Sequence, residues 1–385
     1  MQKTRDSFPD ILRGFALLGI ALVNIPYLSI DTINAAEGAD LTQTSNAAAA
    51  FFVMALFQAK FYLLFSFLFG YSAHYILKDE KSNTKRWVGR SIGLIILGVL
   101  HFSLFFHGDI LFVYGIFGLI LIALYFKKEG TIRKWAKGVF IGSFALFAVL
   151  TLLTFVGELA LRAKGQTIPD EAFTSGLDAA LQSGSFFETI APRVELWIFA
   201  APNGFLLQGP LVFFAFLVGV IAARKNALVN PSDLLLKKLL RWGFAVALPI
   251  QILAAFLLIS NSVGEDSVGI YLIALTLNFY SAPLLSGAYV AVLWRISQKR
   301  KLSLLSAAGK MSLTVYLSQS VIFSFIFSAW GLNQFGKLGV LEVTIIAALT
   351  WLLLAIFAAA YFKRFSKGPM EILLTGFSKL LAGKR

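Results

Sequence analysis

The chain has 385 residues, of which 58% are hydrophobic and only 14% are charged, and its mean hydropathy is +0.78. A soluble domain is closer to half apolar and a quarter charged, so this composition excludes a water-soluble enzyme, a disordered protein and a coiled coil. The absence of cysteine excludes disulfides and a Cys nucleophile. Three histidines are too few for an ordinary structural zinc site, so no metal is expected.

The net charge of +14 has two explanations, nucleic-acid binding or membrane topology. In a polytopic membrane protein, basic residues mark the cytoplasmic loops, so we expect no nucleic-acid partner. Apolar stretches of about 20 residues predict membrane helices, and they lack the strict alternation of barrel strands. The predicted fold class is therefore all-α, a polytopic membrane protein with about ten transmembrane helices, covering residues 11–30, 51–77, 88–106, 109–126, 135–160, 198–223, 242–260, 267–294, 311–330 and 341–362.

The basic residues between these spans predict the orientation of the chain. Twenty-nine of the 34 Lys and Arg residues fall in the termini and in alternate loops, whereas four fall on the other side and Lys60 lies inside a span. The positive-inside rule therefore places both termini in the cytoplasm. The largest cytoplasmic gap, 224–241, predicts a boundary between an N-terminal half (1–223), which contains a polar cavity, and a C-terminal half (224–385). Spans one to four of the N-terminal half are expected to form this single cavity, with Arg13, Asn24, Lys60 and His101 in it, because each of these residues is too costly to face lipid.

Ionisable residues inside a membrane are costly, so they indicate either a functional site or a paired structural group. Asp10 and Arg13 share one helix face through their i, i+3 spacing. They can form a helix-end ion pair, or Arg13 can bind an anion that arrives from the cytoplasm. Lys60 is too deep to reach the interface easily, so it requires either a structural ion pair or a hydrated functional cavity.

His101, Asp109 and Asn24 fall near the outer ends of their spans, with His101 and Asn24 at nearly the same depth. A buried imidazole near a carboxylate is the commonest general base, although a neutral histidine can also simply bond to a neighbouring group. If both helices run straight, Asp109 lies about 6 Å above His101 along the axis. Direct contact between them would therefore require helix tilt or a bridging water. His107, in the turn itself, is expected to be solvated.

A second polar cluster begins the ninth span, where Tyr316, Gln319 and Ser320 fall on one helical face. Such residues can serve a site, or they can hydrogen-bond between helices and stabilise the bundle. No nucleophile elbow, phosphate-binding glycine loop, dinucleotide fingerprint or HExxH motif occurs in the chain. The common motifs of soluble enzymes are therefore absent.

Five ordered stretches resemble the YeiB family of bacterial membrane proteins, whose C-terminal half is known as domain of unknown function 418. They span essentially the whole chain: DILRGFALLGIALVNI, KFYLLFSFLFGYSA, GVLHFSLFFHGDILFVYGIFGLI, AAGKMSLTVYLSQSVI and KGPMEILLTGFSK. The resemblance implies a multi-pass protein of the bacterial cytoplasmic membrane.

That family is in turn similar to the transmembrane acyltransferases, which include the lysosomal heparan N-acetyltransferase and transfer an acyl group from cytosolic acyl-CoA to an acceptor across the membrane. The shared feature is Arg13-Gly14 with a polar residue eleven positions after the arginine, here Asn24. The related acyltransferase-3 proteins carry a catalytic histidine at that position, and the heparan enzyme has one in its first outer loop. Because residues 31–50 contain no histidine, the resemblance implies a base at His101.

The leading hypothesis is thus a transmembrane acyltransferase with acyl-CoA as donor substrate. Arg13 and Arg90 would hold the phosphates of acyl-CoA, His101 would deprotonate the acceptor, and Asp109 would orient the imidazole. The residues expected to contact the substrate or to stabilise the oxyanion are Asn24, Lys60, Tyr316, Gln319 and Ser320.

The acceptor is expected to be an extracytoplasmic glycan, lipid or small molecule, and the protein to lie among membrane lipids, with a homodimer possible. Two other functions remain open. A small-molecule or ion transporter would use Lys60, His101 and Asp109 as a coupling path. A non-catalytic membrane scaffold would use none of them.

Overall fold

The structure, a computed structural model, describes residues 7–166, 176–264 and 267–383, and the regular elements in these ranges are all helices. In chain order the α-helices are α1 (Phe8–Ser29), α2 (Thr44–Leu56), α3 (Lys60–Leu77), α4 (Thr84–Leu104), α5 (Leu111–Tyr125), α6 (Glu129–Ala163), α7 (Leu177–Ser183), α8 (Ile190–Asn203), α9 (Gly209–Arg224), α10 (Asp233–Trp242), α11 (Leu248–Val263), α12 (Val268–Ser297), α13 (Ser303–Lys310), α14 (Ser312–Phe327), α15 (Val340–Tyr361) and α16 (Pro369–Leu381).

Eight helical segments in the described part of the chain are long and apolar enough to cross a membrane. The pair α13–α14 adds a ninth if it is one span bent by 86°. The remaining predicted span, 109–126, corresponds to α5, whose 15 residues are apolar but extend only about 22 Å, less than the ~30 Å hydrocarbon core. The all-α polytopic fold is therefore confirmed, and each predicted span coincides with a helix or helix pair.

Three of the predicted spans are interrupted or joined to a neighbouring helix. The span predicted at 51–77 consists of α2 and α3, which are separated by a break where Ala59 has φ 66°. A β-carbon makes this left-handed backbone unfavourable, so the surrounding structure must stabilise it. Short π-helical turns join α8 to α9 and α10 to α11. Such turns bend a helix without ending it.

The broken helix α13–α14 packs closely against α1. A Cβ at Gly14 would lie 2.0 Å from the Leu305 carbonyl oxygen, and one at Gly309 would lie 1.7 Å from that of Asp10. Only glycine permits this approach of the two backbones. The contact joins the start of the chain to its C-terminal third, so the two predicted halves pack against each other, and the boundary at 224–241 stays a prediction.

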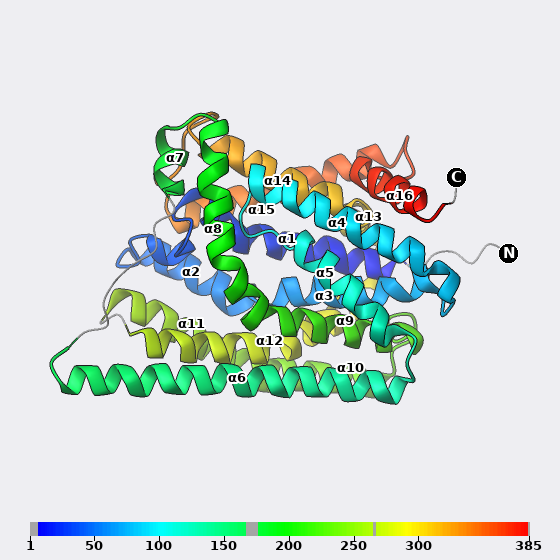
Figure 1. Cartoon of the computed structure of the whole chain (residues 1–385), viewed down its shortest axis with the longest axis horizontal. Coiled ribbons are helices and arrows are strands. Elements are labelled where there is room, and N and C mark those ends of the chain that lie inside the picture. Colours follow the sequence, from blue (N-terminus) through cyan, green and yellow to red (C-terminus); the bar gives the residue numbers. More distant parts are fainter. Residues whose placement is uncertain (1–6, 167–175, 265–266, 384–385) are drawn as a thin grey trace.

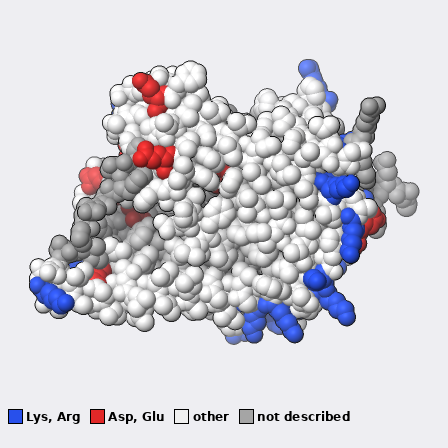
Figure 2. All heavy atoms as spheres, viewed as in Figure 1, with Lys and Arg blue, Asp and Glu red and all other residues white. Residues whose placement is uncertain are grey.

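Most helices lie roughly along the long axis of the molecule, whereas α8 runs across it; α6 lies along one flank, and both termini are at the same end (Figure 1). The Lys and Arg side chains visible on this face gather mainly at that end, and most Asp and Glu side chains lie toward the other (Figure 2). We call the two ends the basic end and the acidic end. This separation is what the positive-inside rule requires of a protein with both termini in the cytoplasm.

The largest group of buried apolar side chains joins α1, α3, α4, α5, α9 and α14. Apolar side chains of α6 remain exposed along much of its length, as expected for a helix that faces lipid. The buried group therefore packs around α3, and the buried polar residues form two groups on different sides of this helix.

Candidate functional site

His101 and Asp109 form a buried pair near the acidic end of α4. The imidazole Nδ1 lies 2.7 Å from the Asp109 Oδ1, and the two side chains are 1% and 0% exposed. The contact is direct, which differs from the geometry expected for straight helices. α4 ends at Leu104, and the following segment returns Asp109 to the level of His101.

Asp109 is held in place from two sides. Its Oδ2 accepts a hydrogen bond of 2.7 Å from the backbone N–H of Phe112, in the first turn of α5. At Gly98, one turn before His101, a Cβ would lie 2.4 Å from the Phe112 nitrogen and 2.7 Å from Asp109 Oδ2. Because glycine has no side chain, α5 and the Asp109 carboxylate can approach α4 closely. This approach brings Asp109 and His101 together.

The pairing determines which nitrogen of His101 is available. An ionised Asp109 fixes the proton on Nδ1, so the lone pair lies on Nε2. In the part of the chain that the structure describes, Nε2 is buried and has no hydrogen-bond partner. The Tyr316 ring lies 5.1 Å from the imidazole, centroid to centroid, and its hydroxyl is also buried without a partner among the described residues. A base and a hydroxyl donor are therefore adjacent and unsatisfied.

A cavity of about 50 Å³ lies beside this group, between α3, α4, α5, α14 and α16. Its polar lining residues are Tyr114, Tyr316, Ser312 and Arg90. Arg90 is half-buried, and its guanidinium lies 6.0 Å from the centroid of the Phe69 ring. The volume is enough for a few water molecules. Of the predicted site residues, Tyr316 and Arg90 line this space, whereas His101 and Asp109 do not. We call it the His101 cavity because the His101 imidazole packs against the Tyr316 ring that lines it.

Glu371 of α16 caps the N-terminus of α14 at the basic end of this cavity. Its Oε1 accepts hydrogen bonds from the backbone N–H groups of Leu313 (2.7 Å) and Thr314 (3.3 Å), and its Oε2 accepts one from the Thr314 hydroxyl (2.7 Å). A carboxylate is favoured there because the first N–H groups of a helix are unpaired and carry positive partial charge. The C-terminal helix is thereby attached to the helix that carries Tyr316.

Arg13 forms the predicted i, i+3 ion pair with Asp10. The Arg13 Nη1 lies 2.7 Å from the Asp10 Oδ1, and Asp10 is 1% exposed whereas the Arg13 side chain is 18% exposed. Asp10 therefore neutralises part of the charge of Arg13, and Arg13 keeps access to the basic end. Both functions suggested for the pair, helix-end anchor and anion binding, fit this geometry.

Lys60 lies in a different polar cluster. Its Nζ donates to the carbonyl oxygen of Met54 (2.9 Å) and to Oε1 of Gln251. Gln251 Nε2 in turn donates to the Asn278 carbonyl (2.7 Å) and to Ser281 Oγ (2.8 Å). Lys60 is fully buried at the break between α2 and α3, with partners from α2 and α11. It is therefore not part of the His101 cavity, contrary to the single cavity expected for these spans.

The three other predicted substrate residues are dispersed. Gln319 donates to the Leu17 carbonyl (3.3 Å) and so links α14 to α1, as a stabilising interhelical bond would. Ser320 is buried one turn after Tyr316. Asn24 is half-buried on α1 and is not among the described residues that line the cavity.

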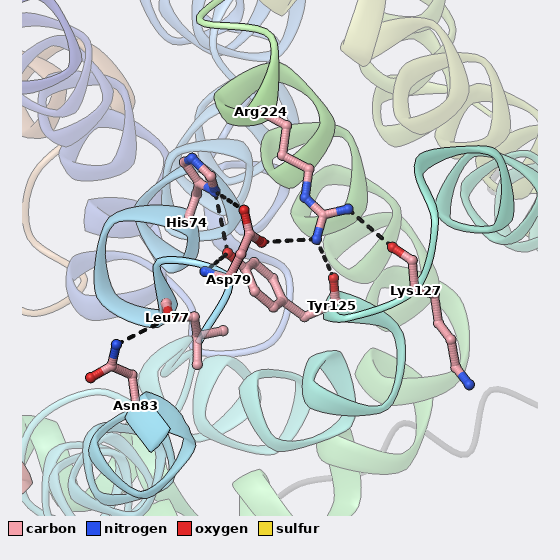
Figure 3. Close-up of polar contacts among 7 residues, drawn as sticks. All are labelled: His74, Leu77, Asp79, Asn83, Tyr125, Lys127 and Arg224. Carbon is pink, nitrogen blue, oxygen red and sulfur yellow. Dashed lines mark hydrogen bonds and ion pairs between the residues drawn. The ribbon is translucent and has the colours of Figure 1, made fainter. Parts of the chain in front are cut away.

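The other two histidines have different surroundings. His74, at the basic end of α3, contacts the Tyr125 hydroxyl (3.2 Å) and Asp79 Oδ2 (3.7 Å). Figure 3 shows this cluster, in which Arg224 bonds to Asp79 and to the end of α5. His107 lies in the loop after α4, with its ring 6.1 Å from that of Tyr27. His101 alone among the three histidines pairs with a buried carboxylate.

Arg193 is a buried cation at the end of α4 that the sequence did not indicate. It is 2% exposed on α8, and its Nη1 donates to the carbonyls of Ser103 (3.3 Å) and Leu104 (3.0 Å), the last two residues of α4. A cation at a helix C-terminus is favoured by the helix dipole. The sequence separation of residues 103 and 193 gave no signal of this contact. Glu371 was also not predicted as a site residue, although it falls within a stretch, KGPMEILL, that resembles the YeiB family.

Comparisons with known proteins agree with that resemblance. The family model described as Protein of unknown function (DUF418) matches residues 222–377. The Uncharacterized protein YeiB of Escherichia coli (strain K12) is 27% identical over 394 residues, which cover 97% of this chain and 96% of that protein. Residues 222–377 thus match the DUF418 family, and the whole chain is similar to YeiB. The family model lies almost entirely within the predicted C-terminal half, and the likeness to YeiB extends over both halves.

Two further relatives of the chain are from bacilli. The Uncharacterized protein YxaH of Bacillus subtilis (strain 168) is 28% identical over 392 residues, covering 94% of this chain and 92% of that protein. The Uncharacterized 39.9 kDa protein in amylase 3'region of Bacillus acidopullulyticus is 28% identical over 374 residues, covering 94% and 90%. No solved structure matches the chain. These names state no activity.

Proposed function

We propose that the protein is a transmembrane acyltransferase, which moves an acyl group from cytosolic acyl-CoA to an extracytoplasmic acceptor. The observation that supports it best is the buried His101–Asp109 pair, whose Nε2 lies free beside the Tyr316 ring. A carboxylate that orients one imidazole nitrogen, leaving the other for proton transfer, is the arrangement of a general base. The resemblance of Arg13-Gly14 and Asn24 to the transmembrane acyltransferases suggests the reaction, and in it His101 would supply the base that residues 31–50 lack.

In the proposed reaction, His101 Nε2 accepts a proton from the hydroxyl or amine of the acceptor as that oxygen or nitrogen attacks the thioester carbonyl carbon. The Tyr316 hydroxyl donates a hydrogen bond to the carbonyl oxygen as negative charge develops there. The carbon–sulfur bond then breaks, and the imidazolium returns the proton to the departing thiolate. Asp109 remains ionised and stabilises the imidazolium.

The basic end fits the donor of this reaction. Arg13 and Arg90 lie on α1 and α4, and arginine is suited to binding the phosphates of acyl-CoA. The cavity of about 50 Å³ cannot hold a thioester with its acceptor, so the surrounding helices must separate on binding. Glu371 attaches α16 to α14, so these two helices would move together.

The test is a transfer assay on purified protein in lipid vesicles, with acetyl-CoA and palmitoyl-CoA as donors and membrane extract as the source of acceptors. His101→Gln should reduce the release of coenzyme thiol by about 10²–10⁴ while binding of acyl-CoA persists. His74→Gln, at the basic end, is the matched control and should leave the release unchanged. Full activity in His101→Gln, or the absence of thermal stabilisation by either acyl-CoA, would contradict the proposal.

One observation favours a second candidate, the transport of a small molecule or ion. The break between α2 and α3 is a discontinuous membrane helix with buried Lys60 at its centre, and transporters build their substrate sites at such breaks. If the protein is a transporter, Lys60→Met would abolish uptake of the transported molecule or ion by vesicles that contain the protein. Acyl-CoA would then give no thermal stabilisation, and His101→Gln would leave uptake unchanged, which separates this candidate from the acyltransferase.

A further inference from the structure

A second cavity, of about 370 Å³, lies between α3, α9, α10 and α12. Its volume is within the range of small-molecule binding sites. It lies on the other face of α3 from the His101 cavity: Leu63, Leu64 and Phe67 line the large cavity, whereas Phe65 and Phe69 line the small one. We call it the α3–α12 cavity. An acyl group bound there is separated from His101 by the width of a helix, so this cavity has no part in the proposed acyl transfer.

The lining of the α3–α12 cavity selects for hydrocarbon. Its side chains are apolar except for the Ser286 hydroxyl and the Trp294 indole. The Ser286 hydroxyl is already used, because it donates to the Lys60 carbonyl at 2.9 Å. Water gains no hydrogen bonds in an apolar cavity, and an empty one forfeits the dispersion contacts of its walls. A flexible hydrocarbon chain fits both conditions.

The helices that form the cavity carry basic residues where they reach the basic end. The amphipathic helix α10 turns Leu235, Leu236 and Leu239 toward the cavity and exposes Lys238 and Arg241. On α12, Trp294 lines the cavity and Arg295 beside it is exposed. An apolar face combined with a basic rim is the pattern of helices at the interface of anionic membranes, where tryptophan is also enriched.

We propose that the α3–α12 cavity binds one acyl chain of an anionic phospholipid from the leaflet at the basic end, with the phosphate held by the basic rim. The chain occupies the apolar walls up to Ser286, and Lys238, Arg241 and Arg295 face the head group. The bound lipid then packs between α10 and the core of the bundle, where it supports the wall adjoining the Lys60 cluster.

The experiment uses the full-length protein in vesicles that contain phosphatidylglycerol or phosphatidylcholine with a photoreactive diazirine on one acyl chain. After irradiation, labelled peptides are identified by mass spectrometry. Phosphatidylglycerol should label peptides of α9, α10 and α12 preferentially, and unlabelled phosphatidylglycerol should compete more strongly than phosphatidylcholine. Val218→Phe combined with Ala222→Phe, which fills the cavity from α9, should remove most of this labelling.

Two further variants make the result specific. Leu353, on α15, is 66% exposed, so Leu353→Phe adds bulk outside the cavity and should leave the labelling unchanged. Lys238→Gln combined with Arg241→Gln should abolish the preference for phosphatidylglycerol while labelling of the cavity persists. Labelling spread evenly over α6 and α15 as well would overturn the proposal, since it would indicate ordinary boundary lipid. So would displacement by palmitoyl-CoA but not by phosphatidylglycerol.

Discussion

Asp109 binds His101 and the first turn of α5 at the same time, with 2.7 Å from Oδ1 to the imidazole Nδ1 and 2.7 Å from the Phe112 nitrogen to Oδ2. One carboxylate thus fixes the tautomer of the imidazole and caps the next helix. The position of the proposed base therefore depends on how α4 and α5 pack, and substitutions at the contact of these helices should alter activity and stability to different extents.

Asp109→Asn should separate these two roles. The amide oxygen can still accept the Phe112 N–H, so α5 keeps its cap, but the amide cannot stabilise an imidazolium. We expect acyl transfer to fall by about 10²–10⁴ with only a small decrease in melting temperature. Transfer rate and thermal unfolding are measured on the same preparation. A variant with normal transfer would show that Asp109 is only a helix cap.

Gly98→Ala should destabilise the protein by forcing α4 and α5 apart. The new Cβ would lie 2.4 Å from the Phe112 backbone nitrogen, which cannot move without the helix. Overpacking of this kind costs about 1–3 kcal/mol. Gly142→Ala on α6 is the control, because nothing lies within 4 Å of that Cβ. Its melting temperature should stay the same or rise slightly, owing to the higher helix propensity of alanine. Equal effects of the two substitutions would contradict the close approach.

Lys60→Met should lower the stability of the protein more than the loss of a surface lysine does. Methionine fills a similar volume but leaves Gln251 Oε1 without its donor and leaves the Met54 carbonyl with only the 3.4 Å hydrogen bond from Asn278 Nδ2. Each buried acceptor left unsatisfied costs about 1–3 kcal/mol. Lys85→Met, at an exposed position, is the control and should change stability by less than about 0.5 kcal/mol. Unfolding in denaturant measures both, and a Lys60→Met variant as stable as the control would show that the cluster contributes little.

Glu371→Ala should release α16 from α14. The substitution removes the acceptor for the Leu313 and Thr314 N–H groups, and loss of a helix cap costs about 0.5–2 kcal/mol. Limited proteolysis should then cleave faster within residues 363–383. Lys379→Ala changes an exposed residue of the same helix and should leave the cleavage rate unchanged. The same rate in both variants would mean that apolar packing alone holds α16.

A fluorescent reporter fused after Arg385, of a kind that folds only in the cytoplasm, should be active. The same reporter inserted after Gly165, in the loop after α6 at the acidic end, should be inactive. These results follow from the positive-inside rule and the charge separation between the two ends (Figure 2). The opposite pattern would invert the topology and place the proposed donor site on the wrong side.

The sequence by itself determined the all-α membrane fold and the positions of the spans, because hydrocarbon requires long apolar segments whose backbone groups bond within the same segment. It also predicted the pair Asp10–Arg13, since residues three apart on one helix are neighbours whatever surrounds them. The family was recognisable because its ordered stretches lie in the chain itself. His101 was singled out because of burial and a nearby carboxylate, and both features are encoded locally.

Only the tertiary structure decided which polar groups meet. The predicted 6 Å offset between His101 and Asp109 assumed straight, parallel helices, whereas the loop after α4 and the missing side chain of Gly98 allow direct contact. Lys60 was expected beside His101, yet the left-handed backbone at Ala59 breaks the helix and leaves Lys60 among α2 and α11. Hydropathy reports the depth of a residue but not the direction in which its helix faces. That direction is determined by close packing between helices that are distant in sequence, so it cannot be predicted from any single stretch of the chain.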